Sequence, residues 1–383
     1  MGRGTANGGE VVTTDWLAAA DRVAAVAAQH AADGEQQRRL PMPVVEAMRA
    51  EGVQRMCVPA AYDGPELDPP TILQVIERIA TADGAAGWCT MIATTTSLLS
   101  HYVQPDQARA IWGDPAHFTG GVFARNAKAT KVDGGYRVSG AWMWGSGTQH
   151  CDWITGGATG DGFSGSMWFR PEQVVFDDTW HTSGLRGTGS TDFHVDDVFV
   201  PDALATQPQV TGPQVESPLG AFPDLTLLAV GVAAAGLGIG RHALDAIVEL
   251  GTEKKPQFSS RTISQSGVAQ YELAKAEAAL RSARAFLLDE VSQAWATAVA
   301  GGRVDVAARG RMRLAGAHAA EACVKAADAA YTLGGGTSIF QHSPLQRCLR
   351  DAHVVTQHIM VAPRLYETLG KLHFGIDIDA AMI

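Results

Sequence analysis

Apolar residues recur at helical spacing along the first part of the chain. Ile72, Ile76 and Ile79, for example, fall on one face of a predicted helix. A more uniformly apolar helix follows over about residues 85–103, after an aspartate-glycine pair that interrupts the spacing. The pattern predicts an N-terminal helical domain over residues 14–114.

The spacing changes at about Pro115. From there, short runs in which apolar and polar residues alternate are separated by glycines, as at residues 136–140, 165–169 and 193–195. Alternation with a period of two is typical of strands that bury one face. Several short strands at this spacing predict a small β-barrel or sandwich over residues 115–205.

Residues 206–223 are rich in proline, glycine and serine, a composition typical of a linker. Helical spacing then returns, and Leu280 and Leu287 belong to one long apolar stripe. The pattern predicts four long helices within residues 224–383, of which the last should break near Pro363. Four such helices suit a four-helix bundle, so the predicted fold class is α+β: helices, then a β-domain, then a bundle.

The composition narrows the possible partners. Hydrophobic residues make up 46% of the 383 residues and charged residues 18%, which is typical of a globular protein. A net charge of -10 and a pI near 5.6 argue against nucleic-acid binding, which needs a basic surface. The apolar run 227–239 is interrupted by glycines and predicts a buried helix rather than a membrane span.

The five cysteines are scattered along the chain and include no Cys-x-x-Cys pair. This spacing favours neither a disulfide framework nor a metal site, and it fits a reducing compartment. The start of the chain shows no signal-peptide pattern. We therefore expect a cytoplasmic protein without a bound metal.

The segment near the end of the chain carries the most informative pattern. Arg350, Asp351 and Ala352 form an RDA triplet, and around it the chain resembles the last helices of the acyl-CoA dehydrogenase superfamily. In the dehydrogenases a glutamate that removes a substrate proton follows this triplet, whereas here that position holds Ile359 and the residue before it is His358. The chain is therefore similar to the reduced-flavin-dependent monooxygenases that share this fold, and the order of its predicted domains matches the superfamily.

Two further segments resemble flavin contacts of that superfamily. Residues 134–147 read GGYRVSGAWMWGSG, and residues 185–190 read LRGTGS. The resemblance implies that the first segment lies against the flavin ring, with the Ser146 hydroxyl at its reactive edge, and that the second hydrogen-bonds the ring or its ribityl chain. Ordinary hairpin turns would also place glycines here. The candidate contacts are Trp144, Ser146, Gly147, Arg186, Thr188 and Ser190.

A glycine run at residues 334–336 precedes the RDA helix. Exposed N–H groups at such a place can hold phosphate, although helix capping explains the run equally well. In the superfamily a loop of this kind contacts the flavin nucleotide of a neighbouring subunit, which makes Gly335 and Gly336 candidates. Of the cations in the preceding loop, Lys255 and Arg261, we expect Arg261 to meet the flavin phosphates.

His358 is the candidate that acts on the substrate. Imidazole titrates near neutrality and can take a proton from a phenol, thiol or amine. The resemblance implies that a separate flavin reductase supplies reduced FMN or FAD, that O2 adds to the flavin, and that Ser146 and nearby N–H groups stabilise the result. It also implies a homotetramer and a small apolar or aromatic substrate.

Two other functions remain open from the sequence. A true dehydrogenase acting on an acyl thioester would need a carboxylate base from another helix, and Glu249, Glu253 and Glu367 are available. A non-catalytic relative would bind a ligand or only assemble. Retention of both flavin-like segments and of the glycine run argues against the second of these.

Overall fold

Capped helices fill the N-terminal region, as the apolar spacing predicts. The computed structural model describes residues 14–380 and 383, and its first helix begins where Asp15 accepts two backbone hydrogen bonds at 3.1 Å. Asp68 and Asp83 cap α3 and α4 in the same way. The α-helices of this region are α1 (Trp16–Gln37), α2 (Met42–Glu51), α3 (Pro69–Ala82), α4 (Gly84–Ser97) and α5 (Pro105–Trp112).

A seven-stranded sheet follows, with the order β5-β6-β2-β1-β3-β4-β7. Only β1 and β3 are parallel neighbours, and the other neighbours are antiparallel. The edge strands β5 and β7 do not pair within the described residues, so the sheet is open and the predicted barrel is not confirmed. The strands are β1 (Thr119–Val132), β2 (Gly135–Trp142), β3 (Trp153–Gly160), β4 (Phe163–Phe169), β5 (Val175–Asp177), β6 (Asp192–Pro201) and β7 (Ala205–Thr206).

The longest strand, β1, was not among the runs that predict strands. Its sequence lacks regular alternation, and its pairing with β3 shifts register between Val122 and Arg125 and again before Ala127. A bulge of this kind places consecutive side chains out of phase, so the period of two disappears from the sequence. The register of β6 against β2 also shifts once, between Val138 and Gly140.

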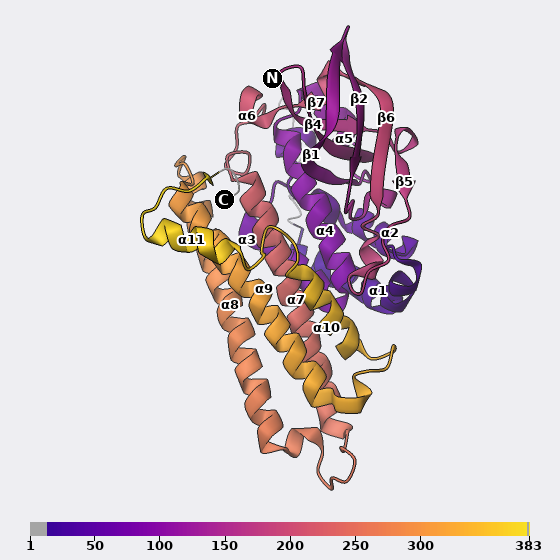
Figure 1. Ribbon diagram of the computed structural model, residues 1–383, viewed down its shortest axis with the longest axis vertical. Helices are drawn as coiled ribbons and strands as arrows, with labels where there is room; N and C mark the ends of the chain where they lie inside the picture. Colours follow the sequence, from indigo (N-terminus) through magenta and orange to yellow (C-terminus); the bar gives the residue numbers. More distant parts are fainter. Residues whose placement is uncertain (1–13, 381–382) are drawn as a thin grey trace, which may run out of the picture.

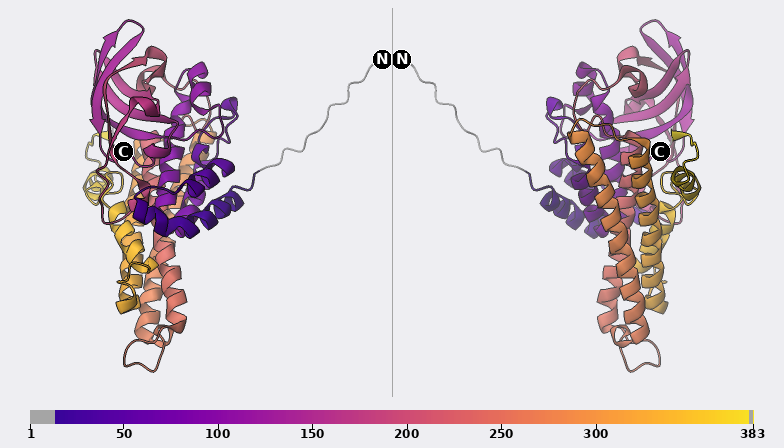
Figure 2. Two further views of the ribbon diagram at one scale, coloured as in Figure 1. Left: turned by 90° about the vertical axis from the view of Figure 1, so that its right-hand side faces the viewer. Right: turned by 90° about the vertical axis from the view of Figure 1, so that its left-hand side faces the viewer.

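Long C-terminal helices form the end of the elongated molecule that lies opposite the sheet (Figure 1). Figure 2 shows from both sides that the sheet and the bundle occupy its two ends, with the N-terminal helices beside them. The predicted stripe of α8 is buried, including Leu280 and Leu287. The helices are α6 (Pro208–Thr211), α7 (Asp224–Glu253), α8 (Gly267–Val299), α9 (Val306–Gly334), α10 (Pro344–Val355) and α11 (Leu365–His373).

The fourth long helix of the predicted bundle is in fact two short helices. α10 ends at Val355, and residues 356–364 form turns before α11 begins. The N–H of His358 donates to the carbonyl of Val355, three residues back, so the last helical turn tightens and stops. Pro363 disfavours helical dihedrals at the residue before it, so α11 begins only after this proline. His358 therefore lies in a turn rather than on a helix.

α7 runs through the centre of the bundle. It is long and apolar enough to cross a membrane by length and composition, but 89% of its most apolar window is buried inside the structure, as in the core helix of a soluble protein. Three closely spaced glycines, Gly236, Gly238 and Gly240, lie buried within this helix. A Cβ at Gly238 would come within 2.4 Å of a carbonyl of α3, so these glycines permit close helix packing.

α4 connects the bundle with the sheet. On one side Gly84 packs against Ile239 of α7, and Met91 packs against Gly231 of the same helix. On the other side Ile92 reaches Gly120 of β1. Side chains of α4 can therefore contact the sheet and the bundle at once, which places the candidate site at this junction.

Candidate active site

The turn after β2 holds the Ser146 hydroxyl in a fixed position. Trp144 and Gly147 both have left-handed backbone dihedrals, with φ of 66° and 69°, and the Trp144 indole is 66% exposed. Each N–H of the turn donates to a protein acceptor at 2.9–3.1 Å. The Trp144 N–H donates to the Asp192 carboxylate, and the Gly145 N–H to the Thr191 carbonyl. The Ser146 N–H donates to the Trp144 carbonyl, and the Gly147 N–H to the Thr188 carbonyl. The expected role of these N–H groups as donors to a ligand is therefore wrong for this conformation.

The Ser146 hydroxyl belongs to a chain of buried polar groups. Ser146 Oγ lies 2.6 Å from Ser190 Oγ, which lies 2.6 Å from Thr188 Oγ1. Thr188 Oγ1 donates to the Leu185 carbonyl at 2.8 Å. All three hydroxyl-bearing residues are at most 5% exposed. Three of the predicted site residues are thus brought together, and they come from two separate segments of the sheet domain.

Trp88 of α4 joins this chain to His358. Its Nε1–H donates to Ser146 Oγ at 3.0 Å, and its ring meets the His358 ring edge-on with 5.5 Å between centroids. The sequence did not single out Trp88. One apolar tryptophan in a buried helix carries no pattern that separates a site residue from a core residue.

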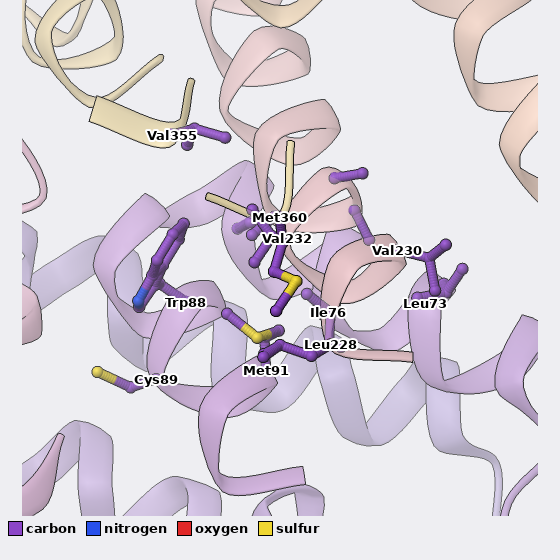
Figure 3. Packing of buried hydrophobic residues seen from close by; sticks show 14 of the residues in the cluster. Leu73, Ile76, Trp88, Cys89, Met91, Leu228, Val230, Val232, Val355 and Met360 are labelled. Atoms are coloured by element: carbon purple, nitrogen blue, oxygen red, sulfur yellow. The ribbon is translucent and has the colours of Figure 1, made fainter. Parts of the chain in front are cut away.

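Apolar side chains surround this junction. Met91 of α4, Met360 after α10, and Leu228 and Val232 of α7 belong to the same buried apolar cluster as Trp88, and Figure 3 shows them in one close view. Methionine side chains are flexible and polarizable, so they adapt to flat aromatic groups. The surroundings therefore suit an apolar or aromatic molecule rather than a charged one.

His358 is held as a neutral imidazole. Burial, and secondly the nearby Arg313 guanidinium, lower its pKa to about 4. Its Nδ1 accepts the N–H of Met360 at 3.3 Å, which favours the tautomer that carries hydrogen on Nε2. At neutral pH the ring can therefore form hydrogen bonds with a substrate, and it gains a proton less readily than an exposed histidine.

The RDA helix is tied directly to the sheet domain. Asp351 Oδ1 accepts the N–H of Leu185 at 2.6 Å, and a Cβ at Gly184 would lie 2.5 Å from the Arg350 carbonyl. Arg350 pairs with Glu35 at 2.7 Å. The segment that contains Thr188 and Ser190 is thus anchored on α10, which explains physically why an aspartate and a glycine stand at these two positions.

Comparison with known proteins agrees with this arrangement. Residues 17–112 match the family model for the acyl-CoA dehydrogenase N-terminal domain, and residues 230–363 match that for the C-terminal domain. An indole-3-acetate monooxygenase from Pseudomonas putida is 35% identical over 349 residues, 89% of each chain. The oxygenase subunit HsaA of a flavin-dependent monooxygenase from Rhodococcus jostii is 30% identical, over 93% of this chain and 97% of that one.

The chain belongs to the acyl-CoA dehydrogenase superfamily. Within it, the relatives are flavin-dependent monooxygenases, so the chain is an oxidoreductase of that class. A solved structure of XiaF from Streptomyces sp., in complex with FADH2 and glycerol, superimposes with a TM-score of 0.87 at 25% identity, covering 95% of this chain and 96% of that one. Reduced flavin and O2 are accordingly the cofactor and the co-substrate.

The residues at the turn fit a flavin ring. Ser146 offers a buried hydroxyl, and the exposed Trp144 offers an aromatic ring for stacking. A Cβ at Gly147 would lie 3.4 Å from Cys89 Sγ, so this glycine allows α4 to approach the turn closely. Reduced flavin would supply electrons for oxygen chemistry at this place. Arg186 points elsewhere: its Nε lies 3.9 Å from the Glu35 carboxylate, so the structure does not bring it to the Ser146 hydroxyl.

A cation that the sequence did not single out, Lys254, lies beside the glycine run, and the expectation that Arg261 meets the flavin phosphates stays a prediction. Lys254 Nζ donates to the Gly334 carbonyl, and it lies 4.0 Å from the position of a Cβ at Gly335. Arg261 lies exposed in the loop before α8, where its N–H bonds to Ser259. Gly336 has open space around it. If superfamily members bind phosphate here, Lys254 is the group in place.

The carboxylates considered for a dehydrogenase lie outside the junction. Glu249 and Glu253 are exposed on α7, and Glu367 is exposed on α11, where it pairs with Lys371. Ile359, at the position of the dehydrogenase glutamate, is 43% exposed. None of these three carboxylates is placed to remove a proton beside Ser146, so the structure gives no support to acyl-thioester oxidation.

A polar pocket of about 310 Å³ opens beside the turn. It is lined by Gln37 at the end of α1, by Arg38 and Arg39 directly after it, and by side chains of the sheet domain that include Trp180. Its lining does not include Ser146 or His358, so it is a neighbouring surface rather than the junction itself. Among the described residues, no group of three or more His, Cys, Asp or Glu side chains gathers as a metal site.

Proposed function

We propose that this chain is the oxygenase component of a two-component monooxygenase acting on a small aromatic substrate. The observation that carries the proposal is the contact series Ser146–Trp88–His358, in which the indole N–H donates to the Ser146 hydroxyl and the indole ring meets the imidazole edge-on. The apolar residues around it favour a planar aromatic molecule. The relative named as an indole-3-acetate monooxygenase makes indoles the first substrates to test.

In this proposal each residue has a separate task. The turn around Ser146 receives the flavin edge, and Trp88 fixes the Ser146 hydroxyl while forming one wall of the substrate site. His358 hydrogen-bonds the reacting substrate and takes up its proton when the substrate is oxygenated. The apolar surroundings keep water away, which limits loss of the activated oxygen as hydrogen peroxide.

Further partners belong to the same proposal. The HsaA relative is named as an oxygenase subunit, which supports a separate reductase as the supplier of reduced FMN or FAD. A homotetramer would bring the glycine run of one subunit to the nucleotide of another, with Gly335, Gly336, Arg261 and Lys254 as the groups to examine. A cytoplasmic location suits the unbridged, buried cysteines.

The test begins with the protein and reduced flavin under anaerobic conditions. On mixing with oxygen, we expect a transient near-ultraviolet absorbance band, recorded in milliseconds, before the spectrum of oxidised flavin appears. A protein that holds oxidised FAD tightly and oxidises acyl thioesters without such a transient would refute the proposal.

A matched pair of variants tests the role of His358 in turnover. H358A should retain binding of reduced flavin but lose product formation by about 100-fold or more, the range expected for a proton-transferring group. H353A is the control, because His353 is exposed on the neighbouring helix and pairs with Asp328 at 3.1 Å. Equal turnover in the two variants would remove His358 from the mechanism.

A further inference from the structure

The three buried hydroxyls at Ser146 have just enough hydrogens to fill the three hydrogen bonds that they form. Ser146, Ser190 and Thr188 each carry one hydroxyl hydrogen. Three oxygen–oxygen contacts of 2.6–2.8 Å must each contain one hydrogen: Ser146 to Ser190, Ser190 to Thr188, and Thr188 to the Leu185 carbonyl. A contact this short without a hydrogen would set lone pairs against each other.

The carbonyl at the end of the series sets its direction. A carbonyl only accepts, so Thr188 donates to Leu185. Ser190 must then donate to Thr188, and Ser146 must donate to Ser190. The Ser146 hydroxyl has no hydrogen left, and one of its two lone pairs already accepts the Trp88 N–H at 3.0 Å.

The rest of the turn adds no donor. Its N–H groups, from Trp144 to Gly147, all bond to protein acceptors. Toward a ligand, Ser146 therefore offers one lone pair. A ligand atom that carries hydrogen can donate a hydrogen bond to Ser146 Oγ. A ligand atom that has only a lone pair is instead repelled by the lone pair of Ser146 Oγ.

We infer that this one-way series of hydroxyls makes the site selective for reduced over oxidised flavin. The inference rests on the proposed function, in which the flavin edge meets Ser146. The central-ring nitrogen at that edge carries hydrogen in reduced flavin and only a lone pair in oxidised flavin. Thr188, at the far end of the series, is a positioning residue that sets this preference without touching the ring.

The decisive variant is T188V, which preserves the shape of the side chain and removes its hydroxyl. Leu185 keeps a partner, because the Trp180 Nε1–H also donates to its carbonyl at 3.1 Å. Ser190 no longer has Thr188 as an acceptor, so it can donate to Ser146, and Ser146 can then donate to oxidised flavin. The direction of donation between Ser190 and Ser146 thus reverses, while the two contacts of the Thr188 hydroxyl, to Ser190 and to the Leu185 carbonyl, are lost.

Dissociation constants for oxidised and anaerobically reduced FMN and FAD provide the readout, by fluorescence titration. In wild type, reduced flavin should bind more tightly than oxidised flavin. In T188V the ratio of the two constants should fall by about tenfold, the size expected for one net hydrogen bond, mainly because oxidised flavin binds better. T188S restores the hydroxyl and should restore the wild-type ratio.

A second variant protects the test against a folding defect. S190A leaves the Thr188–Leu185 bond intact but frees the Ser146 hydrogen, so it should also bind oxidised flavin better. An unchanged ratio in both folded variants would overturn the inference while product formation by wild type still supports the proposed function. If wild-type protein bound neither flavin form, the proposed function itself would fail.

Discussion

Asp351→Asn tests the tie between the RDA helix and the sheet domain. Asp351 is 4% exposed, and burial raises the pKa of its carboxyl to about 7 against the opposing hydrogen bond from Leu185. The nearby carboxylates of Glu35 and Asp83 raise it further. Asparagine keeps the oxygen that accepts the Leu185 N–H, but it does not ionise.

The expected magnitude follows from the shift in pKa. The folded protein keeps the proton of Asp351 up to about pH 7, whereas the unfolded chain releases it near the ordinary aspartate pKa of 3.8. Between these values the folded state binds more protons, so its stability falls as pH rises. At 1.36 kcal/mol per pH unit, the part of this loss between pH 5 and pH 8 is roughly 3 kcal/mol.

Urea unfolding at pH 5 and pH 8 measures the effect. The free energy of unfolding of D351N minus that of wild type should rise by roughly 3 kcal/mol between the two pH values. D351A also lacks the ionising carboxyl, so its difference from wild type should change with pH in the same way, but it should be about 1–3 kcal/mol less stable than D351N at both pH values, because it leaves the buried Leu185 N–H without its acceptor. D328N, at an exposed aspartate of α9, is the control. A difference between D351N and wild type that does not change with pH would refute the reasoning.

Three further outcomes can be checked. G184A should lose about 1–3 kcal/mol in urea unfolding, since its Cβ would meet the α10 backbone at 2.5 Å, while G370A, with open space around it, should not. Since its pKa of about 4 keeps His358 neutral above that pH, the histidine should add no inflection to kcat/KM between pH 6 and pH 8, and NMR titration of its ring should show none there. K254M should weaken flavin binding about tenfold, by loss of a phosphate contact, more than R261M does in the same fluorescence titration.

The sequence predicted the helices and the two flavin-like segments because their signals are local. The apolar spacing repeats within each helix, and the helix ends are fixed by neighbouring groups, as where the Asp15 carboxylate and the Gly52 N–H form cap hydrogen bonds. The sequence did not predict the open form of the sheet or the strand β1. Closure depends on whether β5 and β7 meet in space, and the bulges of β1 remove its alternation, so neither can be read from neighbouring residues.

The candidate site shows the same division. Ser146, Thr188 and Ser190 could be found because each lies in a short glycine-containing segment with a recognisable order. Trp88 could not, since its importance comes only from the two partners that the fold brings to it. Lys254 was not singled out for a related reason: it meets the glycine run only because the end of α7 packs against that run in the fold.

One bonded path connects the RDA helix with the substrate side of the site. Asp351 holds the peptide of Leu185 by its N–H, and the carbonyl of the same residue ends the hydroxyl series that begins at Ser146. A shift of α10 would therefore move the acceptor that fixes every hydrogen in that series. His358 follows α10 by only three residues, so the same shift would also move the imidazole. The helix that carries a base in the dehydrogenases can thus retain a role here without one, by setting the position of His358 and the polarity of Ser146 together.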